Sequence, residues 1–296
     1  MRGMLLNIYK GRNWYVFILP FFILFAVFWV FPIIYSLVLS FAEADLAGIA
    51  AFVGFANYAK LMETPLFWKA LGNTFLYTIG YMGIGLTLAL GFALLLNQDL
   101  KFKSFYRVIY FLPVITSEVA VSMIWNQLYN KEFGFLNQNI FLPLFKTAPG
   151  WLTDSRLALW SLLVFCIWQG IGYYIILFLA GLQAIPLQLY EAAQIDGAGA
   201  VRQFLNVTLP ALAPSIVLIA ILAGINCLQV FIPMQIITRG GPAYSTYTLG
   251  LLIYNNGFDW YNRGLASAIS YVLLVIILVF SVIQRRIINK SLGQEG

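Results

Sequence analysis

Long uncharged stretches dominate the chain and alternate with short segments that carry the charged residues. Five uncharged intervals are each long enough to cross a bilayer: 13–42, 70–98, 157–190, 203–238 and 264–284. A sixth stretch, 108–117 joined to 119–130, is interrupted only by Glu118. Because a helix of about 20 residues spans the roughly 30 Å hydrocarbon core, the pattern predicts an all-α polytopic membrane protein with six transmembrane helices.

The ends of these runs divide the chain into three parts. We expect residues 1–69 to hold an N-terminal tail, the first transmembrane helix and an external segment. Residues 70–284 form a five-helix core, and 285–296 form a cytoplasmic tail. The apolar run 14–41 is too long for the apolar region of a signal sequence and lacks a suitably placed cleavage site, so we interpret it as a retained helix.

Composition supports membrane embedding. Hydrophobic residues make up 61% of the chain and charged residues 9%, against roughly 45–50% and 25% in soluble domains. The chain has no histidine and only two cysteines, Cys166 and Cys227, both inside predicted spans. Neither a Ser-His pair, a metal site nor a nucleotide-binding P-loop can be assembled, so we expect no catalytic residues, no metal site and no enzyme activity on this chain.

Basic residues fall unevenly on the two sides of the predicted membrane. Six spans place both termini on one side, which carries ten basic residues against four acids, whereas the other side carries seven against six. Cytoplasmic loops are enriched in Lys and Arg. We therefore expect Met1, Gly296 and the loop around Glu191 to be cytoplasmic, and the net charge of +6 gives no reason to invoke nucleic acid. The ten are Arg2, Lys10, Arg12, Lys101, Lys103, Arg107, Arg202, Arg285, Arg286 and Lys290.

One charged segment, 186–210, lies between two of the longest apolar runs and contains the sequence EAAQIDGAGAVRQFLNVTLP from Glu191 onward. Charges at the bilayer centre cost about 2.5–3.5 kcal/mol each, so this segment must be a surface loop. Pro186 can start a helix, and Gly197 and Gly199 then break it. An apolar face resumes at Phe204, which predicts two short helices joined by a glycine bend.

The loop resembles the signature of bacterial ABC importer permeases: Glu-Ala-Ala, three residues, Gly, nine residues, a β-branched residue, any residue, Leu-Pro. Val207 stands where isoleucine is usual. In that family the loop docks into a separate ATPase subunit. The alternative is an arbitrary amphipathic cytoplasmic loop. The resemblance implies that the ATPase-coupling residues are Glu191, Ala192, Ala193, Asp196, Gly197, Ala198 and Phe204.

The resemblance extends over most of the chain, through 52–75, 111–137 and the 237–258 segment with its Gly-Gly-Pro turn. In these segments the chain is similar to one of the two permease subunits of a maltose-type sugar importer in a bacterial inner membrane. The partners implied are a second homologous permease, two ATPase subunits that hold ATP and Mg, an external solute-binding protein and a sugar or oligosaccharide.

Polar and aromatic residues gather in the fourth and fifth spans, where a solute path is expected near the membrane midplane. Aromatic faces stack on sugar rings, and amides exchange hydrogen bonds with hydroxyls. The family pattern points to the same helices, although Cys227, Leu228 and Val230 depart from its asparagine-rich part. Helix packing and interhelical hydrogen bonding are the alternatives. The predicted path residues are Trp168, Gln169, Gly170, Tyr173, Asn226 and Gln229.

Glu118 is the one acid inside a predicted span. An intramembrane carboxylate suggests a functional role, but this one can simply form a hydrogen bond to a partner subunit. Two other functions stay open: an ion-coupled secondary carrier or channel that uses Glu118, and an ABC permease for a non-sugar solute such as an amino acid or a metal ion.

Overall fold

The computed structural model describes residues 17–98 and 101–291, and the chain divides into two compact units. One unit contains the described residues up to Glu63 together with Ile253–Tyr271, and the other contains Thr64–Leu252 and the described residues from Val272 onward. The expected cytoplasmic ends, Met1 and Gly296, lie outside the described residues, as do Arg2, Lys10 and Arg12.

Membrane-length helices account for most of the described chain. Four helices are long and apolar enough to cross a bilayer: Phe17–Ser40, Pro65–Asn97, Ala158–Gln183 and Arg263–Arg286. Two bent pairs also pass when each is taken as one span, Phe105–Ile115 with Glu118–Leu128 and Ala200–Ala211 with Ala213–Leu228. Counting each pair once gives six spans within the described residues, which agrees with the number that the uncharged intervals predict.

The first unit begins with the Phe17–Ser40 helix, which contains the π-helical turn η1 (Ala26–Val30) and α2 (Phe31–Ser40). A small antiparallel hairpin follows, β1 (Ala42–Asp45) and β2 (Gly48–Phe52), which the sequence did not predict. The unit also contains α3 (Ala56–Glu63), η6 (Asn255–Asp259), the last residues of α14 (Leu249–Tyr254) and the start of α15 (Arg263–Ser291). Asn57 joins the hairpin to α2 because its amide donates to the carbonyls of Ser40 and Ala42.

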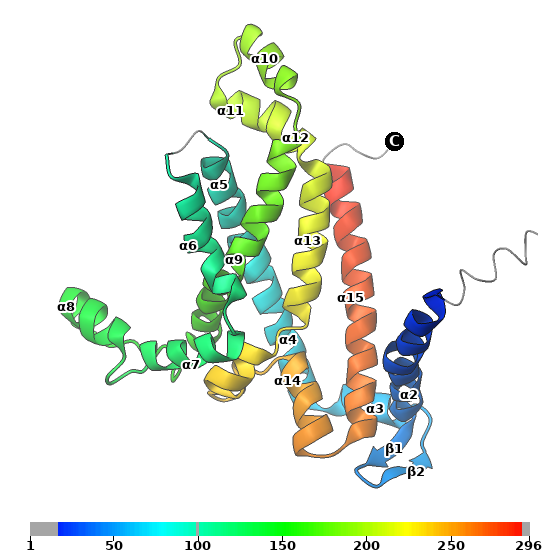
Figure 1. Ribbon diagram of the computed structural model, residues 1–296. Coiled ribbons are helices and arrows are strands. Elements are labelled where there is room, and N and C mark those ends of the chain that lie inside the picture. Colours follow the sequence, from blue (N-terminus) through cyan, green and yellow to red (C-terminus); the bar gives the residue numbers. More distant parts are fainter. Residues whose placement is uncertain (1–16, 99–100, 292–296) are drawn as a thin grey trace, which may run out of the picture. The chain divides into compact units, whose positions relative to one another are not determined.

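The second unit is a helical bundle around α9 (Ala158–Gln183), which contacts α4 (Pro65–Gly80), α5 (Leu86–Asn97), α6 (Lys103–Ile115) and α13 (Ala213–Leu228) (Figure 1). A π-helical turn, η2 (Tyr81–Gly85), makes α4 and α5 one continuous span. The remaining elements are α7 (Glu118–Leu128), η3 (Asn137–Phe141), α8 (Leu142–Phe145), α10 (Leu187–Ile195), α11 (Ala200–Gln203), η4 (Phe204–Thr208), α12 (Leu209–Ala211) and η5 (Met234–Thr238).

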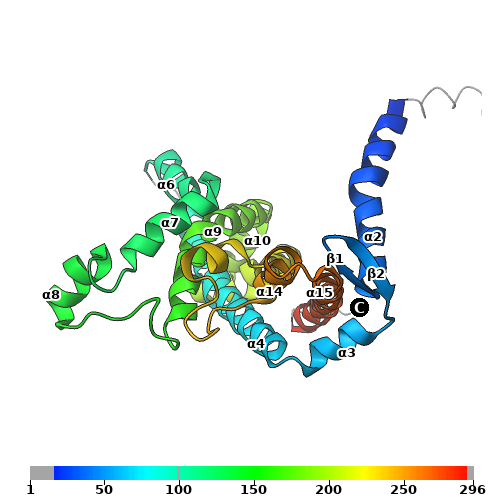
Figure 2. The same ribbon diagram turned by 90° about the horizontal axis from the view of Figure 1, so that it is seen from below.

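A sharp bend separates α6 from α7. Pro113 lies inside α6, and the chain leaves the helix at Thr116, with the two helices inclined by 95°. The Thr116 hydroxyl donates to the Pro113 carbonyl at 2.6 Å and so satisfies one of the free carbonyls at the helix end. Figure 2 shows α7 and α8 projecting sideways from the other helices of this unit. The bend therefore places Glu118, the first residue of α7, at a break in the middle of a membrane-crossing segment.

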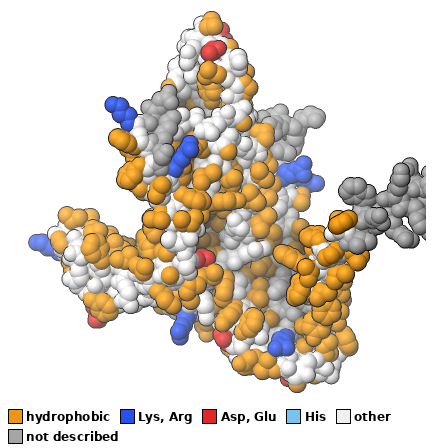
Figure 3. Space-filling view, in the orientation of Figure 1, with side chains coloured by type: hydrophobic (Ala, Val, Ile, Leu, Met, Phe, Trp, Pro, Cys, Tyr) orange, Lys and Arg blue, Asp and Glu red, His pale blue; other side chains and the backbone are white. Residues whose placement is uncertain are grey.

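Apolar side chains cover much of the face seen in Figure 3, with few charged residues among them. The Phe17–Ser40 helix buries none of its apolar window inside the structure, and Phe28, Trp29 and Phe31 are all exposed. In water such a surface would be unfavourable, but lipid tails are as apolar as these side chains. The exposed surface is what a multi-pass membrane protein presents to lipid and to partner subunits.

The close approach of α6 and α9 gives a direct test of the bundle. A Cβ added at Gly172 would collide with the carbonyl oxygen of Tyr110 and lie 3.0 Å from Val114 Cγ2. Gly172→Ala should therefore lower the melting temperature of the purified protein, since overpacking costs about 1–3 kcal/mol. Gly91→Ala is the matched control, because nothing lies within 4 Å of that position. Equal melting temperatures for the two variants would contradict the α6–α9 packing.

Candidate functional site

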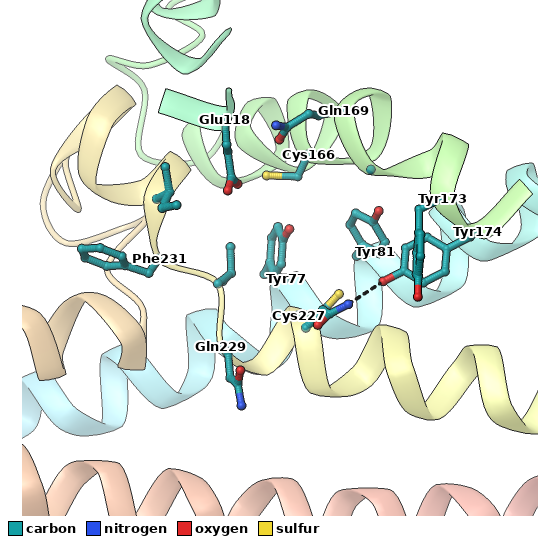
Figure 4. A pocket seen from close by; sticks show the side chains of 14 residues that line it. Tyr77, Tyr81, Glu118, Cys166, Gln169, Tyr173, Tyr174, Cys227, Gln229 and Phe231 are labelled. Carbon is teal, nitrogen blue, oxygen red and sulfur yellow. Dashed lines mark hydrogen bonds between the residues drawn. The ribbon is translucent and has the colours of Figure 1, made fainter. Parts of the chain in front are cut away.

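A cavity of about 470 Å³ lies inside the second unit, between α4, α7, α9 and the end of α13 (Figure 4). Its volume lies in the range of small-molecule sites, about 300–1,000 Å³. It is lined by Tyr77, Tyr81, Glu118, Cys166, Gln169, Gly170, Tyr173, Tyr174, Asn226, Cys227, Gln229, Val230, Phe231 and Ile232.

The cavity lies about halfway along α9 and along the Pro65–Asn97 span. Helix α9 has 26 residues, and its contribution to the cavity runs from Cys166 to Tyr174, around the middle of the helix. On the other side, α13 ends at Leu228, and the chain continues without helix through Val230. The non-helical segment after α13 thus lines the cavity, and the break after α6 ends at Glu118, which lines it as well. Such discontinuous helices near the midplane are typical of solute sites in transporters.

Tyrosines form one wall of the cavity. The ring of Tyr77 on α4 lies 6.0 Å from that of Tyr81, the first residue of η2, and Tyr81 meets Tyr174 of α9 edge to face at 6.0 Å. Tyr174 also accepts a hydrogen bond from the Asn226 amide of α13 at 3.3 Å. Aromatic contacts and this hydrogen bond therefore connect three helices around the cavity. Tyr173, by contrast, is partly exposed and offers both its ring face and its hydroxyl.

The structure brings five of the six predicted path residues into this cavity. Gln169, Gly170 and Tyr173 come from α9, and Asn226 and Gln229 come from the end of α13. Residues three or four apart share a helix face, so Gln169, Gly170 and Tyr173 can line one cavity.

Trp168, the sixth, does not line the cavity. Its ring packs 5.2 Å from that of Trp125, and it borders a separate apolar hollow with Phe92, Tyr106 and Ile171. Because the helix turns by about 100° per residue, Trp168 points away from the face that Gly170 and Tyr173 share. The sequence motif grouped these three residues together, but the helical geometry separates Trp168 from them.

Gly170 has a packing role that its sequence position did not reveal. A Cβ added there would lie 2.6 Å from the hydroxyl oxygen of Tyr81. The space that the missing side chain leaves is therefore already occupied by the Tyr81 hydroxyl. Enlarging Gly170 would displace Tyr81 before it reached a solute.

The sequence analysis did not place Tyr77 and Tyr81 among the residues of the solute path, and it left the role of Glu118 open. Tyr77 and Tyr81 are four residues apart and so share one face of their helix, a spacing visible in the sequence. Glu118 reaches the cavity only because of the bend between α6 and α7, whose direction the sequence does not specify. Figure 4 shows the Glu118 carboxylate and the Tyr77 hydroxyl pointing into the same space.

The lining suits a polar, uncharged solute. Phenols and amides exchange hydrogen bonds with hydroxyl groups, and the tyrosine rings provide flat apolar surface. None of the lining residues is a lysine, arginine or histidine. No group of three or more acidic, cysteine or histidine side chains that could hold a metal ion occurs among the described residues.

A second candidate site is the helical hairpin at the end of α9 (Figure 1). Helix α10 stops where Gly197 adopts a left-handed conformation, with φ of +73°. The chain then continues through α11, η4 and α12 as one helical arm. Two helices joined by a glycine bend are what the sequence predicts for 186–210.

Hydrogen bonds hold the two arms of the hairpin together. The Gln203 amide donates to the Ala198 carbonyl at 2.7 Å, and the hydroxyls of Tyr190 and Thr208 lie 3.0 Å apart. Ile195 is 86% exposed and Val201 74% exposed, so apolar side chains flank the bend. Of the predicted coupling residues, Glu191, Ala192, Asp196 and Gly197 are exposed, and Ala193, Ala198 and Phe204 are partly buried.

Comparison with known proteins identifies the family. Residues 83–292 match the family of binding-protein-dependent transport system inner membrane components. The chain belongs to this family. It is 36% identical over 286 residues to the multiple sugar-binding transport system permease protein MsmF of Streptococcus mutans, with 96% of this chain and 97% of the relative covered. It is 34% identical over 280 residues to the lactose transport system permease protein LacF of Rhizobium radiobacter, with coverage of 93% and 94%.

A solved structure shows the same fold. The permease superposes with a TM-score of 0.85 on a chain of a bacterial ABC transporter involved in the import of the acidic polysaccharide alginate, at 22% identity, with 97% of this chain and 99% of that chain covered. The match confirms the all-α, multi-pass permease fold expected from the sequence. Family membership also makes this permease a membrane transport component, not an enzyme.

Proposed function

We propose that this permease forms part of the path of a sugar or oligosaccharide in an ATP-driven, binding-protein-dependent importer. The main support for this proposal is the cavity, in which tyrosines, Gln169 and Asn226 meet midway along α9. Sugars present hydroxyls at their edges and C–H groups on their faces, and this lining offers partners for both. The names of two relatives, a lactose permease and a multiple-sugar permease, support the same solute class.

The hairpin is the proposed contact with the ATPase. It is the sizeable ordered segment at one end of the α9 bundle, and it exposes apolar side chains beside Gly197. Docking there would let movement of an ATPase that holds ATP and Mg pass along α9 and α13 to the cavity, because these helices enter and leave the hairpin. The proposed complex contains a second, homologous permease, two ATPase subunits and an external solute-binding protein.

The proposed location is a bacterial inner membrane, with the hairpin and both termini in the cytoplasm. The uneven distribution of basic residues supports this orientation. In a variant without the native cysteines, an impermeant thiol reagent added to intact spheroplasts should label Lys146→Cys but not Asp196→Cys. Labelling of Asp196→Cys from outside would reverse the orientation.

Tyr173→Ala tests the path. With the complex reconstituted with its ATPases and binding protein, this variant should need about fivefold to 150-fold more solute for half-maximal uptake, since a stacking surface and a hydrogen bond of about 1–3 kcal/mol are lost. Tyr173→Phe keeps the stacking surface and loses only the hydrogen bond, so its requirement for solute should rise less. Ile176→Ala, at an exposed position on the same helix but outside the cavity, is the control. Unchanged uptake by Tyr173→Ala would remove Tyr173 from the path, and uptake without ATPase subunits would favour an ion-coupled carrier.

Gly197→Ala tests the hairpin. A left-handed conformation costs a non-glycine residue about 1–2 kcal/mol, so alanine should distort the bend and lower solute-stimulated ATP hydrolysis severalfold. Gly199→Ala is the matched control, because Gly199 has an ordinary φ of −69° and nothing lies within 4 Å of either glycine. Both variants should insert into the membrane normally. Equal stimulation of ATP hydrolysis in the two would contradict docking that depends on the bend.

A further inference from the structure

We propose that Glu118 sets the charge preference of the cavity, so that it admits neutral or amino-bearing sugars and excludes sugars that carry carboxylates. This inference rests on the proposed function and names the solute class more narrowly. It follows from the position and surroundings of one carboxylate.

Glu118 is the only charged residue among those that line the cavity. Its side chain is half-buried, and no hydrogen bond or ion pair joins it to another described residue. Buried carboxylates are normally paired with a cation or a donor, because an unpaired charge is costly in a low-dielectric environment. An unpaired carboxylate directed into a cavity is therefore available to a solute.

The fold fixes Glu118 in this position. Thr116 has an extended conformation between the two helices, and Glu118 begins α7 after the 95° bend. At the other end of α7, the Asn126 amide donates to the Ile237 carbonyl at 2.9 Å, which holds the helix against η5. This contact and the bend hold the backbone of α7, and with it Glu118, beside the cavity.

Charge then separates solutes of similar shape. Two like charges a few ångströms apart repel far more strongly in a protein interior than in water, so a uronic acid beside Glu118 is disfavoured. A neutral sugar can donate two hydroxyls to the carboxylate. An amino sugar adds an ion pair, and its ammonium group can also lie against the rings of Tyr77 and Tyr81.

The alginate transporter provides a useful contrast. It shares the fold with a TM-score of 0.85 but is described as an importer of an acidic polysaccharide. At 22% identity the backbone is retained while most side chains differ. The fold alone therefore does not fix the charge of the accepted sugar, and in this permease Glu118 is the one residue of the cavity lining that carries charge.

The test compares three solutes of similar size that carry no charge, a negative charge or a positive charge. A neutral disaccharide that stimulates ATP hydrolysis by the complex with its binding protein is selected first, and its C6-oxidised uronate and its 2-amino derivative are then prepared. Binding of each is measured by saturation-transfer NMR to the permease complex in nanodiscs without the binding protein, so that only the membrane site selects. Wild type should bind the uronate at least about tenfold more weakly than the neutral sugar, a difference of about 1.4 kcal/mol.

Glu118→Gln keeps the shape of the side chain and removes its charge. In this variant the difference in binding affinity between the uronate and the neutral sugar should largely disappear, and any preference for the amino sugar should be lost. Glu118→Asp should retain the discrimination. Glu132→Gln makes the same chemical change at an exposed position outside the cavity and should behave as wild type.

Each outcome decides between the alternatives. Equal binding of uronate and neutral sugar by wild type, or discrimination that persists in Glu118→Gln, would overturn the role of Glu118 while leaving the sugar path intact. If no neutral disaccharide stimulates hydrolysis or binds wild type, the proposed function fails and this inference fails with it. Loss of all binding in Glu118→Gln together with a lower melting temperature would show a structural role instead.

Discussion

The cost of placing polar groups in hydrocarbon is the constraint on which this structure depends. A backbone group without a partner costs several kcal/mol in a bilayer, so a helix can break inside the membrane only where protein or enclosed water satisfies its free ends. The break after α6 meets this condition in part through Thr116, which bonds to the Pro113 carbonyl. Glu118, two residues after Thr116, lines the cavity. The same break that needs an enclosed polar space therefore also brings Glu118 into it.

Tight helix packing encloses that space. Gly172 lets α9 approach the backbone of α6, and Gly170 makes room for the Tyr81 hydroxyl. Gly181, nearer the hairpin, brings α9 close to Ser215 of α13. Small residues at helix contacts are the usual way to bring membrane helices together, because no hydrophobic force drives apolar helices to associate in lipid. Movement of the hairpin would be transmitted through these contacts, since α9 and α13 join it on either side.

The distribution of apolar and charged residues along the sequence predicted much of the fold. The spans could be predicted from the uncharged intervals, and the bend of the hairpin from Gly197, because both features depend only on neighbouring residues in the sequence. The β1–β2 hairpin was missed, since it lies in a short segment where a four-residue strand has little pattern. Gln169 and Tyr173, predicted from residue type, line the cavity, whereas Trp168 lies outside it because the motif ignores the turn of the helix. Tyr77, Tyr81 and the direction of Glu118 depend on how separate helices meet, which no local pattern records.

Access from water is the most direct test of the claim that this cavity forms the solute path. In a variant with Cys166→Ala and Cys227→Ala, a single cysteine is placed at Gln169, inside the cavity, or at Ile176, outside it on the same helix. We expect a hydrophilic thiol reagent to modify position 169 much faster than position 176, and the transported sugar to slow the reaction at 169 alone. Equal rates at the two positions, or a rate at 169 that the sugar leaves unchanged, would contradict it.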